Sequence, residues 1–248
     1  MTGIGSRARS AAAPGPAPRG PDGPSPARGD VAIALFAKAP VAGRVKTRLV
    51  PPLTPEEAAR VARALLVATI DSLVGTLSAR WALFLDGTAD ESLRALATSR
   101  GMSLRPQEGG DLGARLAAAF RTLRAEGATR VLAIGADGPS LPPRLLGEAI
   151  GALAECDVVL GPTEDGGYYL VGTASAGEEI FQDIPWSTGS VLSATLARAA
   201  GAGRSVRLLP AWYDVDSVED LRRLRDEVRR GTAPMGLRAL IDALEGRI

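Results

Sequence analysis

The chain has 248 residues, 46% of them hydrophobic, which is enough to bury a substantial core. Its 29 basic and 28 acidic residues leave a net charge of +1, so the charge gives no reason to expect a nucleic acid or an anionic membrane surface as partner. The absence of histidine excludes Ser-His-Asp and Cys-His catalysis and every histidine-ligated zinc site.

The first part of the chain differs from the rest in composition. Residues 1–29 are rich in Gly, Pro, Ala and Ser, and they offer too little apolar surface to offset the entropy of ordering. Residues 11–13 are cut short by Pro14, so the hydrophobic region of a signal peptide is missing, and no run of about 20 apolar residues predicts a membrane span. We expect a disordered tail at residues 1–29 and a single domain at residues 30–248 in a cytoplasmic protein.

From residue 31 onward, short apolar runs alternate with amphipathic segments. The expected strands lie at residues 31–37, 81–85, 103–105, 131–134, 158–160, 168–171 and 206–209, of which 168–171 is a candidate antiparallel strand. The expected helices lie at residues 55–73, 90–98, 112–125, 142–154, 218–229 and 235–244, with a further one capped by Ser187 or Thr188 and running to about residue 200. This alternation predicts a three-layer α/β fold with a mostly parallel, mixed sheet and helices on both faces.

Aspartates follow several of these strands. Asp137 comes after the strand at 131–134, and Asp214 and Asp216 alternate around Val215, so on an extended chain both would face the same side. Ligands of open α/β sheets bind at the carboxyl ends of the strands, and carboxylates gathered there need a cation. Oxygen ligands of this kind suit Mg²⁺ or Mn²⁺. The pattern predicts a metal-assisted site for a phosphorylated ligand; the alternatives are a turn at Asp137 and a helix start at Asp216.

A basic segment directly follows the first strand. Lys38, Arg44, Lys46 and Arg48 place four cations near Gly43, where α/β folds grip phosphates. Lysine binds phosphate as a point charge, and arginine can bind it bidentately. The segment matches neither the P-loop nor the G-x-G-x-x-G pattern. A solvated basic loop is the alternative, and Lys46 and Arg48 are expected to be exposed.

Two further segments carry polar candidates. Asp111 opens a helix, whose N-terminus attracts anions, and Arg115 lies one turn into it, within reach of a phosphate. Asp165 precedes Gly166 and Gly167, which let a backbone approach a ligand closely. It can bind acceptor hydroxyls or act as a base. A simple N-cap at Asp111 and a tight turn at Asp165 are the alternatives.

Trp186 is a rare aromatic residue in a chain with only 4% aromatics. It is a candidate platform for a sugar or a base, or else an anchor that packs its own loop.

Six motifs resemble one known family, the DUF2064 group of GT-A-like transferases, which are nucleotide-diphospho-sugar transferases, some linked to arsenosugar biosynthesis. They cover about residues 31–230 in order: Lys38-Ala39-Pro40-x-x-Gly43-Arg44-x-Lys46-Thr47-Arg48-Leu49, Gly109-Gly110-Asp111-Leu112-Gly113-x-Arg115-Leu116, Ile134-Gly135-Ala136-Asp137-Gly138-Pro139-Ser140-Leu141, Gly161-Pro162-x-x-Asp165-Gly166-Gly167-Tyr168-Tyr169-Leu170, Ile184-Pro185-Trp186-Ser187-Thr188 and Asp214-Val215-Asp216. One departure is Gly138, where the family more often carries Cys or another side chain.

Shorter blocks are similar to nucleotidyltransferases. Lys46-Thr47-Arg48-Leu49 is similar to guanylyltransferases of the cofactor F420 pathway, and the block from Asp216 to Leu221 resembles the metal-binding end of sugar cytidylyltransferases. The resemblances imply a GT-A fold and a divalent ion, Mg²⁺ or Mn²⁺, on Asp137 and Asp216, with Asp214 as the alternative ligand. They also imply roles for three groups of residues. These are a phosphate cradle of Lys38, Gly43, Arg44, Lys46, Arg48, Asp111 and Arg115, an acceptor side of Asp165, Gly166, Gly167, Trp186, Ser187 and Thr188, and direct catalytic roles for Lys46 and Asp165.

Three functions are consistent with these residues. The first is a metal-dependent glycosyltransferase that takes a nucleotide-diphosphate sugar and a small-molecule acceptor. The second is a guanylyl- or cytidylyl-type nucleotidyltransferase, which releases pyrophosphate from an NTP. The third is a nucleotide-binding domain without catalysis, against which the intact acids argue. The sequence fixes neither the base, the sugar, the acceptor nor the oligomeric state.

Overall fold

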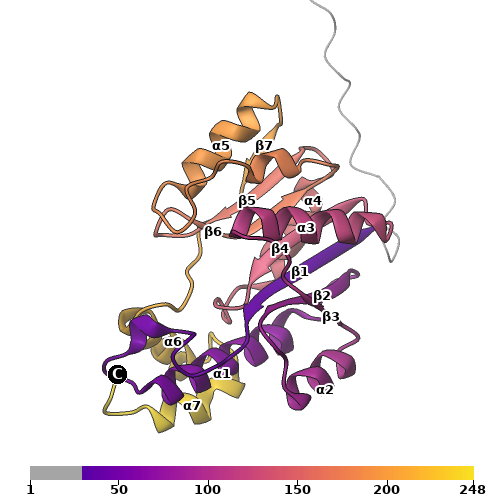
Figure 1. The fold of residues 1–248 in the computed structure, drawn as a ribbon. Coiled ribbons are helices and arrows are strands. Elements are labelled where there is room, and N and C mark those ends of the chain that lie inside the picture. Colours follow the sequence, from indigo (N-terminus) through magenta and orange to yellow (C-terminus); the bar gives the residue numbers. More distant parts are fainter. Residues whose placement is uncertain (1–29) are drawn as a thin grey trace, which may run out of the picture.

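The computed structural model describes residues 30–248, so the tail predicted at residues 1–29 lies outside the described residues (Figure 1). Within them, seven strands form one sheet in the order β3-β2-β1-β4-β6-β5-β7. All pairings are parallel except those of β6, which runs antiparallel to β4 and β5. The strands are β1 (Val31–Lys38), β2 (Arg80–Asp86), β3 (Ser103–Pro106), β4 (Arg130–Gly135), β5 (Val158–Pro162), β6 (Tyr168–Thr173) and β7 (Val206–Leu208).

The helices lie close to the predicted positions. They are α1 (Pro55–Leu73), α2 (Glu91–Ser99), α3 (Leu112–Ala125), α4 (Pro143–Ala152), α5 (Val191–Gly201), α6 (Val218–Arg230) and α7 (Arg238–Ala243), with 3-10 turns at Thr47–Leu49, Glu178–Phe181 and Met235–Leu237. Local signals explain where they begin. Thr54 accepts a hydrogen bond from the amide of Glu57, whose carboxylate accepts one from the amide of Thr54 in return, and Ser217 and Asp220 repeat this box at α6.

Alternate side chains of the sheet enter two cores, as a period of two requires. On β1, Ile33 and Leu35 face the core covered by α1, α2 and α4, whereas Ala32 and Ala34 face the core covered by α3 and α5. Helices therefore cover both faces of a mixed, mostly parallel sheet. The predicted three-layer α/β fold is confirmed (Figure 1).

A third hydrophobic cluster joins α1, α6 and α7 at the lower left of Figure 1. Leu49, from the turn that ends the basic segment, and Tyr213 and Val215, from the segment before α6, are buried in it. This cluster anchors both segments beside the carboxyl ends of β1 and β4. It thereby fixes the position of the charged residues on them.

Two predicted helix boundaries were wrong. The helix expected from Ser187 or Thr188 begins only at Val191, and Thr188 Oγ1 instead donates to the carbonyl oxygen of Pro185 and accepts from the amide of Ser190. The helix expected at residues 235–244 is a 3-10 turn followed by the short α7. Among the described residues no helix has both the length and the apolar character needed to cross a membrane.

Candidate active site at the carboxyl ends of the strands

Lys46 joins two of the predicted acids. Its Nζ lies 2.7 Å from Asp137 Oδ1 and 2.9 Å from Asp216 Oδ1. The lysine side chain is only 5% exposed, which corrects the expectation of an exposed cation, whereas the two carboxylates are 47% and 45% exposed. Burial lowers the pKa of Lys46, but attraction to Asp137 and Asp216 outweighs it and raises the pKa. The structure therefore holds a charged ammonium under two carboxylates that still face solvent.

Asp214 completes a group of three acids. Burial raises its pKa to about 7, and repulsion from Asp137 and Asp216 adds to that effect, while Lys46 opposes it. One nearby ammonium thus balances three carboxyl groups, and Asp214 relieves part of the excess negative charge by holding a proton near neutral pH. The acids of this site therefore carry more negative charge than Lys46 alone neutralises.

Hydrogen bonding and burial orient the acids. Tyr213 and Val215 point into the third hydrophobic cluster, so Asp214 and Asp216 face the other way. The segment is not a strand of the sheet, yet its extended backbone gives the alternation that the sequence predicted. The amide of Val215 donates to the carbonyl oxygen of Asp137 at 2.9 Å, which ties this segment to the loop after β4.

The alternative for Asp216, a helix start, can now be judged. Ser217, not Asp216, is the N-cap of α6, and the carboxylate of Asp216 is free to bind Lys46. Gly138, next to Asp137, packs closely on the segment before α6, because a Cβ there would lie 3.3 Å from Asp214 Oδ1 and from the carbonyl oxygen of Tyr213. A larger residue at this position would press on Asp214.

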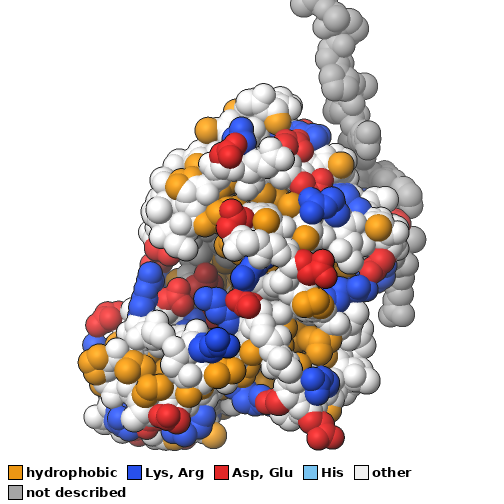
Figure 2. Space-filling model, viewed as in Figure 1, with side chains coloured by type: hydrophobic (Ala, Val, Ile, Leu, Met, Phe, Trp, Pro, Cys, Tyr) orange, Lys and Arg blue, Asp and Glu red, His pale blue; other side chains and the backbone are white. Residues whose placement is uncertain are grey.

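The four cations of the basic segment differ in burial and in pairing. Lys46 is buried and paired, whereas Lys38, Arg44 and Arg48 are exposed and form no ion pair with any described residue. Val45 and Leu49, 6% and 0% exposed, anchor the segment on either side of Lys46. Figure 2 shows blue and red side chains together in a hollow at the left of the view, between the sheet and the cluster of α1, α6 and α7. Three cations are thus available to an anion.

Asp111 and Arg115 have structural partners. Asp111 Oδ1 accepts from the amide of Ala114, which is the N-cap interaction that formed the alternative reading. Arg115 Nη1 lies 2.8 Å from Asp86 Oδ2, at the end of β2. Asp86 pairs in register with Lys38 of β1, so Arg115 reaches the same edge of the sheet as the basic segment. Asp86, which also ends an apolar run, was not among the predicted site residues.

Asp165 closes the turn between β5 and β6. Its Oδ1 accepts from Thr163 Oγ1 at 2.6 Å and from the amide of Gly167 at 3.2 Å. The hydrogen bond from Thr163 is the main cause of the lowered pKa of Asp165, to which Gly167 and Arg48 also contribute. An exposed carboxylate of low pKa suits hydrogen bonds from hydroxyl groups better than proton abstraction.

Gly166 docks this turn onto the loop before α5. It has a φ of +87°, and a Cβ would lie 2.1 Å from the carbonyl oxygen of Gly189. In that loop, Trp186 packs edge-on against Tyr168, with 6.3 Å between the two ring centroids, and its indole lies over Gly113 of α3. Trp186 therefore anchors its loop, while Ser187 and Thr188 stay exposed.

Among residues 30–248, no group of three or more Asp, Glu, His or Cys side chains is arranged to hold a metal ion by itself. Asp137 and Asp216 nevertheless fit a divalent ion that arrives with a ligand, because Mg²⁺ is commonly held by one or two carboxylates together with phosphate oxygens. The carboxylates outnumber the nearby ammonium group, and a divalent cation would balance their excess negative charge.

Comparison with known proteins places the chain in a family. The family model that matches is described as an uncharacterized protein conserved in bacteria (DUF2064), and the match spans residues 69–188. A solved structure from Desulfovibrio desulfuricans G20, provisionally described as a nucleotide-diphospho-sugar transferase, is 30% identical, with 86% of this chain and 97% of that chain covered and a TM-score of 0.75. This chain belongs to the DUF2064 family. The resemblance seen in the six motifs is confirmed.

More distant structures share the fold of this DUF2064 protein. A cytidylyltransferase from Leptospira borgpetersenii serovar Hardjo-bovis is 13% identical, with 87% of this chain and 94% of that chain covered and a TM-score of 0.56. A 4-diphosphocytidyl-2C-methyl-D-erythritol synthase from Anaerococcus prevotii is 11% identical, with 82% and 100% covered and a TM-score of 0.57. The search of curated proteins gave no match.

Proposed function

We propose that this protein is a metal-dependent glycosyltransferase that uses a nucleotide-diphosphate sugar and a small-molecule acceptor. The main observation behind the proposal is that one cation of the basic segment is buried and paired with acids, whereas the other three are exposed. Lys46 sets two half-exposed carboxylates side by side, and three exposed cations of the same segment form no ion pair with a described residue. A diphosphate needs this combination, because its oxygens bind both cationic side chains and a carboxylate-held metal ion. The 30% identity to a protein described as a nucleotide-diphospho-sugar transferase supports the same reading.

Each group has a role in this proposal. Asp137 and Asp216 would hold the divalent ion, which would supply positive charge to the leaving diphosphate, and Asp214 lies beside them. Lys38, Arg44 and Arg48 bind the phosphate oxygens, and Arg115 supports the same edge through Asp86. Lys46 keeps the acids in place while limiting their repulsion.

The acceptor side is formed by the β5–β6 turn and the loop before α5. The charged Asp165 accepts hydrogen bonds from acceptor hydroxyls and orients them, with Gly166 and Gly167 allowing close approach. Ser187 and Thr188 offer further hydroxyls from the neighbouring loop, which Trp186 holds in place. Asp165→Asn should then lower turnover more than nucleotide affinity.

Nucleotidyl transfer is the second candidate. The same metal ion and cations would stabilise attack on the α-phosphate of an NTP with release of pyrophosphate. Four cations near the end of β1 provide enough charge for a triphosphate, and the fold is shared with a cytidylyltransferase. These observations keep this candidate open.

The reaction products separate the two candidates. The full-length protein would be incubated with Mg²⁺ or Mn²⁺, a panel of nucleotide sugars or NTPs, and pooled small-molecule acceptors. We expect a nucleoside diphosphate from a nucleotide sugar, and its loss in Asp137→Asn. Acceptor-dependent pyrophosphate from GTP or CTP, without turnover of any nucleotide sugar, would favour nucleotidyl transfer. Full activity in EDTA would contradict both.

A further inference from the structure

An ion pair links the β5–β6 turn, the proposed acceptor turn, to α6. Arg223 Nη1 donates to Glu164 Oε1 at 3.0 Å. Glu164 lies in the turn, next to Asp165, whereas Arg223 belongs to α6, which packs in the third hydrophobic cluster. The pair therefore joins the sheet to the cluster of α1, α6 and α7, the two parts of the molecule that flank the hollow in Figure 2.

The arginine end of this pair has a fixed platform. The Cζ atom of Arg223 lies 3.7 Å from the centroid of the Tyr213 ring, which is a cation–π contact, and its Nε lies 3.8 Å from Glu227 Oε1. The Tyr213 hydroxyl donates to Glu227 Oε2 at 2.7 Å, and only 3% of Tyr213 is exposed. Because these contacts already restrict the arginine side chain, pairing with Glu164 costs less side-chain entropy than an ordinary surface ion pair does.

The same tyrosine connects Arg223 with the acids of the candidate active site. Asp214 follows Tyr213 directly in the chain. Ser140, from the loop that carries Asp137, donates from its Oγ to the Tyr213 hydroxyl at 3.4 Å. Arg223 therefore stacks on a residue whose contacts reach both segments that carry the proposed metal ligands.

The acceptor turn is attached on both sides of Asp165. Where the turn leaves β5, the amide of Trp212 donates to the carbonyl oxygen of Pro162 at 3.0 Å. Further along the turn, Glu164 binds α6 on one side of Asp165, and Gly166 lies against the loop before α5 on the other. The position of Asp165 thus depends on two contacts made by its immediate neighbours.

Electrostatic repulsion makes the attachment to α6 relevant to Asp165. Burial is the main cause of the raised pKa of Asp214, and repulsion from other acids, including Asp165, adds to it. The same repulsion favours movement of Asp165 away from these acids. The ion pair of Glu164 opposes that movement, because it binds the turn to α6, which begins soon after Asp216.

We propose that Arg223 is a positioning residue that holds Asp165 beside the metal-binding acids through its ion pair with Glu164. The inference rests on the proposed function, in which Asp165 orients the hydroxyl groups of the acceptor. Loss of the pair would let the turn move while the cations of the basic segment stay in place. Turnover of the acceptor should then fall, because displacement of an orienting group is costly, whereas nucleotide affinity should not change.

Hydrogen exchange followed by NMR tests the attachment without any substrate. The amides of Thr163, Gly166 and Gly167 form hydrogen bonds within the turn. In full-length Arg223→Gln they should exchange about tenfold faster than in the wild type, whereas the amides of β5 should not change. Glu164→Gln should have the same effect, and combining the two changes should add nothing, because each alone removes the same pair. Unchanged exchange of the turn in both single variants would overturn the proposal.

Steady-state kinetics test the effect on the acceptor, with the donor and acceptor that give product in the assay described above. Arg223→Gln should lower kcat/KM for the acceptor by about tenfold, while KM for the nucleotide sugar stays within about twofold. Arg223→Lys keeps a positive charge over the Tyr213 ring and should recover part of the loss. A turn that loosens without any change in acceptor kinetics would overturn the positioning role.

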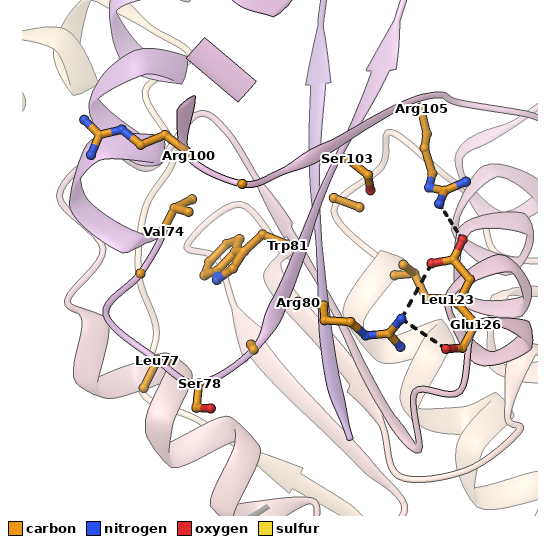
Figure 3. A pocket seen from close by; sticks show the side chains of 14 residues that line it. Val74, Leu77, Ser78, Arg80, Trp81, Arg100, Ser103, Arg105, Leu123 and Glu126 are labelled. Atoms are coloured by element: carbon orange, nitrogen blue, oxygen red, sulfur yellow. Dashed lines mark hydrogen bonds and ion pairs between the residues drawn. The ribbon is translucent and has the colours of Figure 1, made fainter. Parts of the chain in front are cut away.

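Arg105→Gln is the matched control. Arg105 pairs with Glu126 beside a cavity of about 510 Å³ at the amino ends of β2 and β3, whereas the three aspartates lie at the carboxyl ends of the strands (Figure 3). Glu126 keeps Arg80 as a partner in this variant, so neither turn exchange nor kinetics should change. Equal effects of Arg105→Gln and Arg223→Gln would indicate a general loss of stability and would overturn the proposal.

The two measurements also separate this inference from the proposed function. If the wild type forms no product from any nucleotide sugar or NTP, the proposed transfer fails. The exchange rates of the turn then still decide whether Arg223 holds it in place, because they need no substrate.

Discussion

The amide of Val215 donates a hydrogen bond of 2.9 Å to the carbonyl oxygen of Asp137. This bond joins the loop after β4 to the segment before α6, so two stretches far apart in the sequence present their carboxylates to the same ammonium group. The geometry of the acids is thus set by the backbone, and side-chain substitutions there should test charge more than fold.

Lys46→Met should destabilise the protein, because Asp137 and Asp216 would lose their shared cation. We expect a loss of about 1–3 kcal/mol at pH 7.5, less than for a fully buried pair because both carboxylates face solvent. Mg²⁺ should restore part of the loss and should stabilise this variant more than the wild type. Urea unfolding with and without Mg²⁺ measures both effects.

The matched control is Arg48→Ala, in the same segment. Its stability should stay within about 0.5 kcal/mol of wild type, since Arg48 is exposed and unpaired, while its affinity for nucleotides falls. Equal stability of the two variants would contradict the buried role of Lys46.

Asp137→Asn should fold normally and lose metal-dependent nucleotide binding, because a neutral amide is a poorer ligand for a hard cation. Isothermal titration with a nucleoside diphosphate, with Mn²⁺ present or chelated, measures this. Asp183→Asn is the control, since the side chain of Asp183 is 86% exposed and pairs with Arg198, outside the site. Metal-dependent binding that survives in Asp137→Asn would remove this residue from the site.

Asp214→Asn should raise Tm at high pH. The carboxyl pKa is raised from 3.8 to about 7, so the folded protein binds a proton that the unfolded chain has already released. The stability that this proton provides is complete below about pH 4 and is lost as pH rises toward and through 7. The variant should therefore be more stable than wild type at pH 8, and the advantage should vanish near pH 4. A series of Tm measurements from pH 4 to 9 tests the trend, and an advantage that grows on acidification would contradict it.

Gly166→Ala should separate the β5–β6 turn from the loop before α5. The new methyl group would collide with the carbonyl oxygen of Gly189, and the φ of +87° is unfavourable for alanine. We expect a loss of about 2–4 kcal/mol. Gly203→Ala controls for the backbone effect alone, because Gly203 has a φ of +69° with open space around it, and should lose only about 1 kcal/mol. Similar losses for the two variants would show that the contact with Gly189 carries no weight.

Much of the fold follows from local signals in the sequence. Thr54, Asp111 and Ser217 cap the helices that their positions predict, because each side chain satisfies an amide only a few residues away. The alternation around Val215 also predicted that Asp214 and Asp216 share a side, although the expectation depends on an extended backbone and not on membership of the sheet.

Features set by distant contacts were not predictable in the same way. The burial of Lys46 arises because Asp137 and Asp216 approach it from other parts of the chain, so its charge pattern alone looked like that of an exposed loop. Ser187 has a φ of +64°, which bends the loop before α5 and delays the helix to Val191. Asp86 could be connected with the site only in the structure, where Arg115 of α3 pairs with it.

The antiparallel pairing of β6 with β5 affects where proteins of this fold can vary in sequence. The proposed phosphate side depends on β1 and β4, where a shift of register would displace the acids and the basic segment together. The proposed acceptor side is instead a turn between two strands already held next to each other by β5–β6 hydrogen bonds. Such a turn can lengthen, shorten or change residues without moving either strand. Under the proposed function, changes at this turn would exchange one acceptor for another while the nucleotide chemistry stays the same.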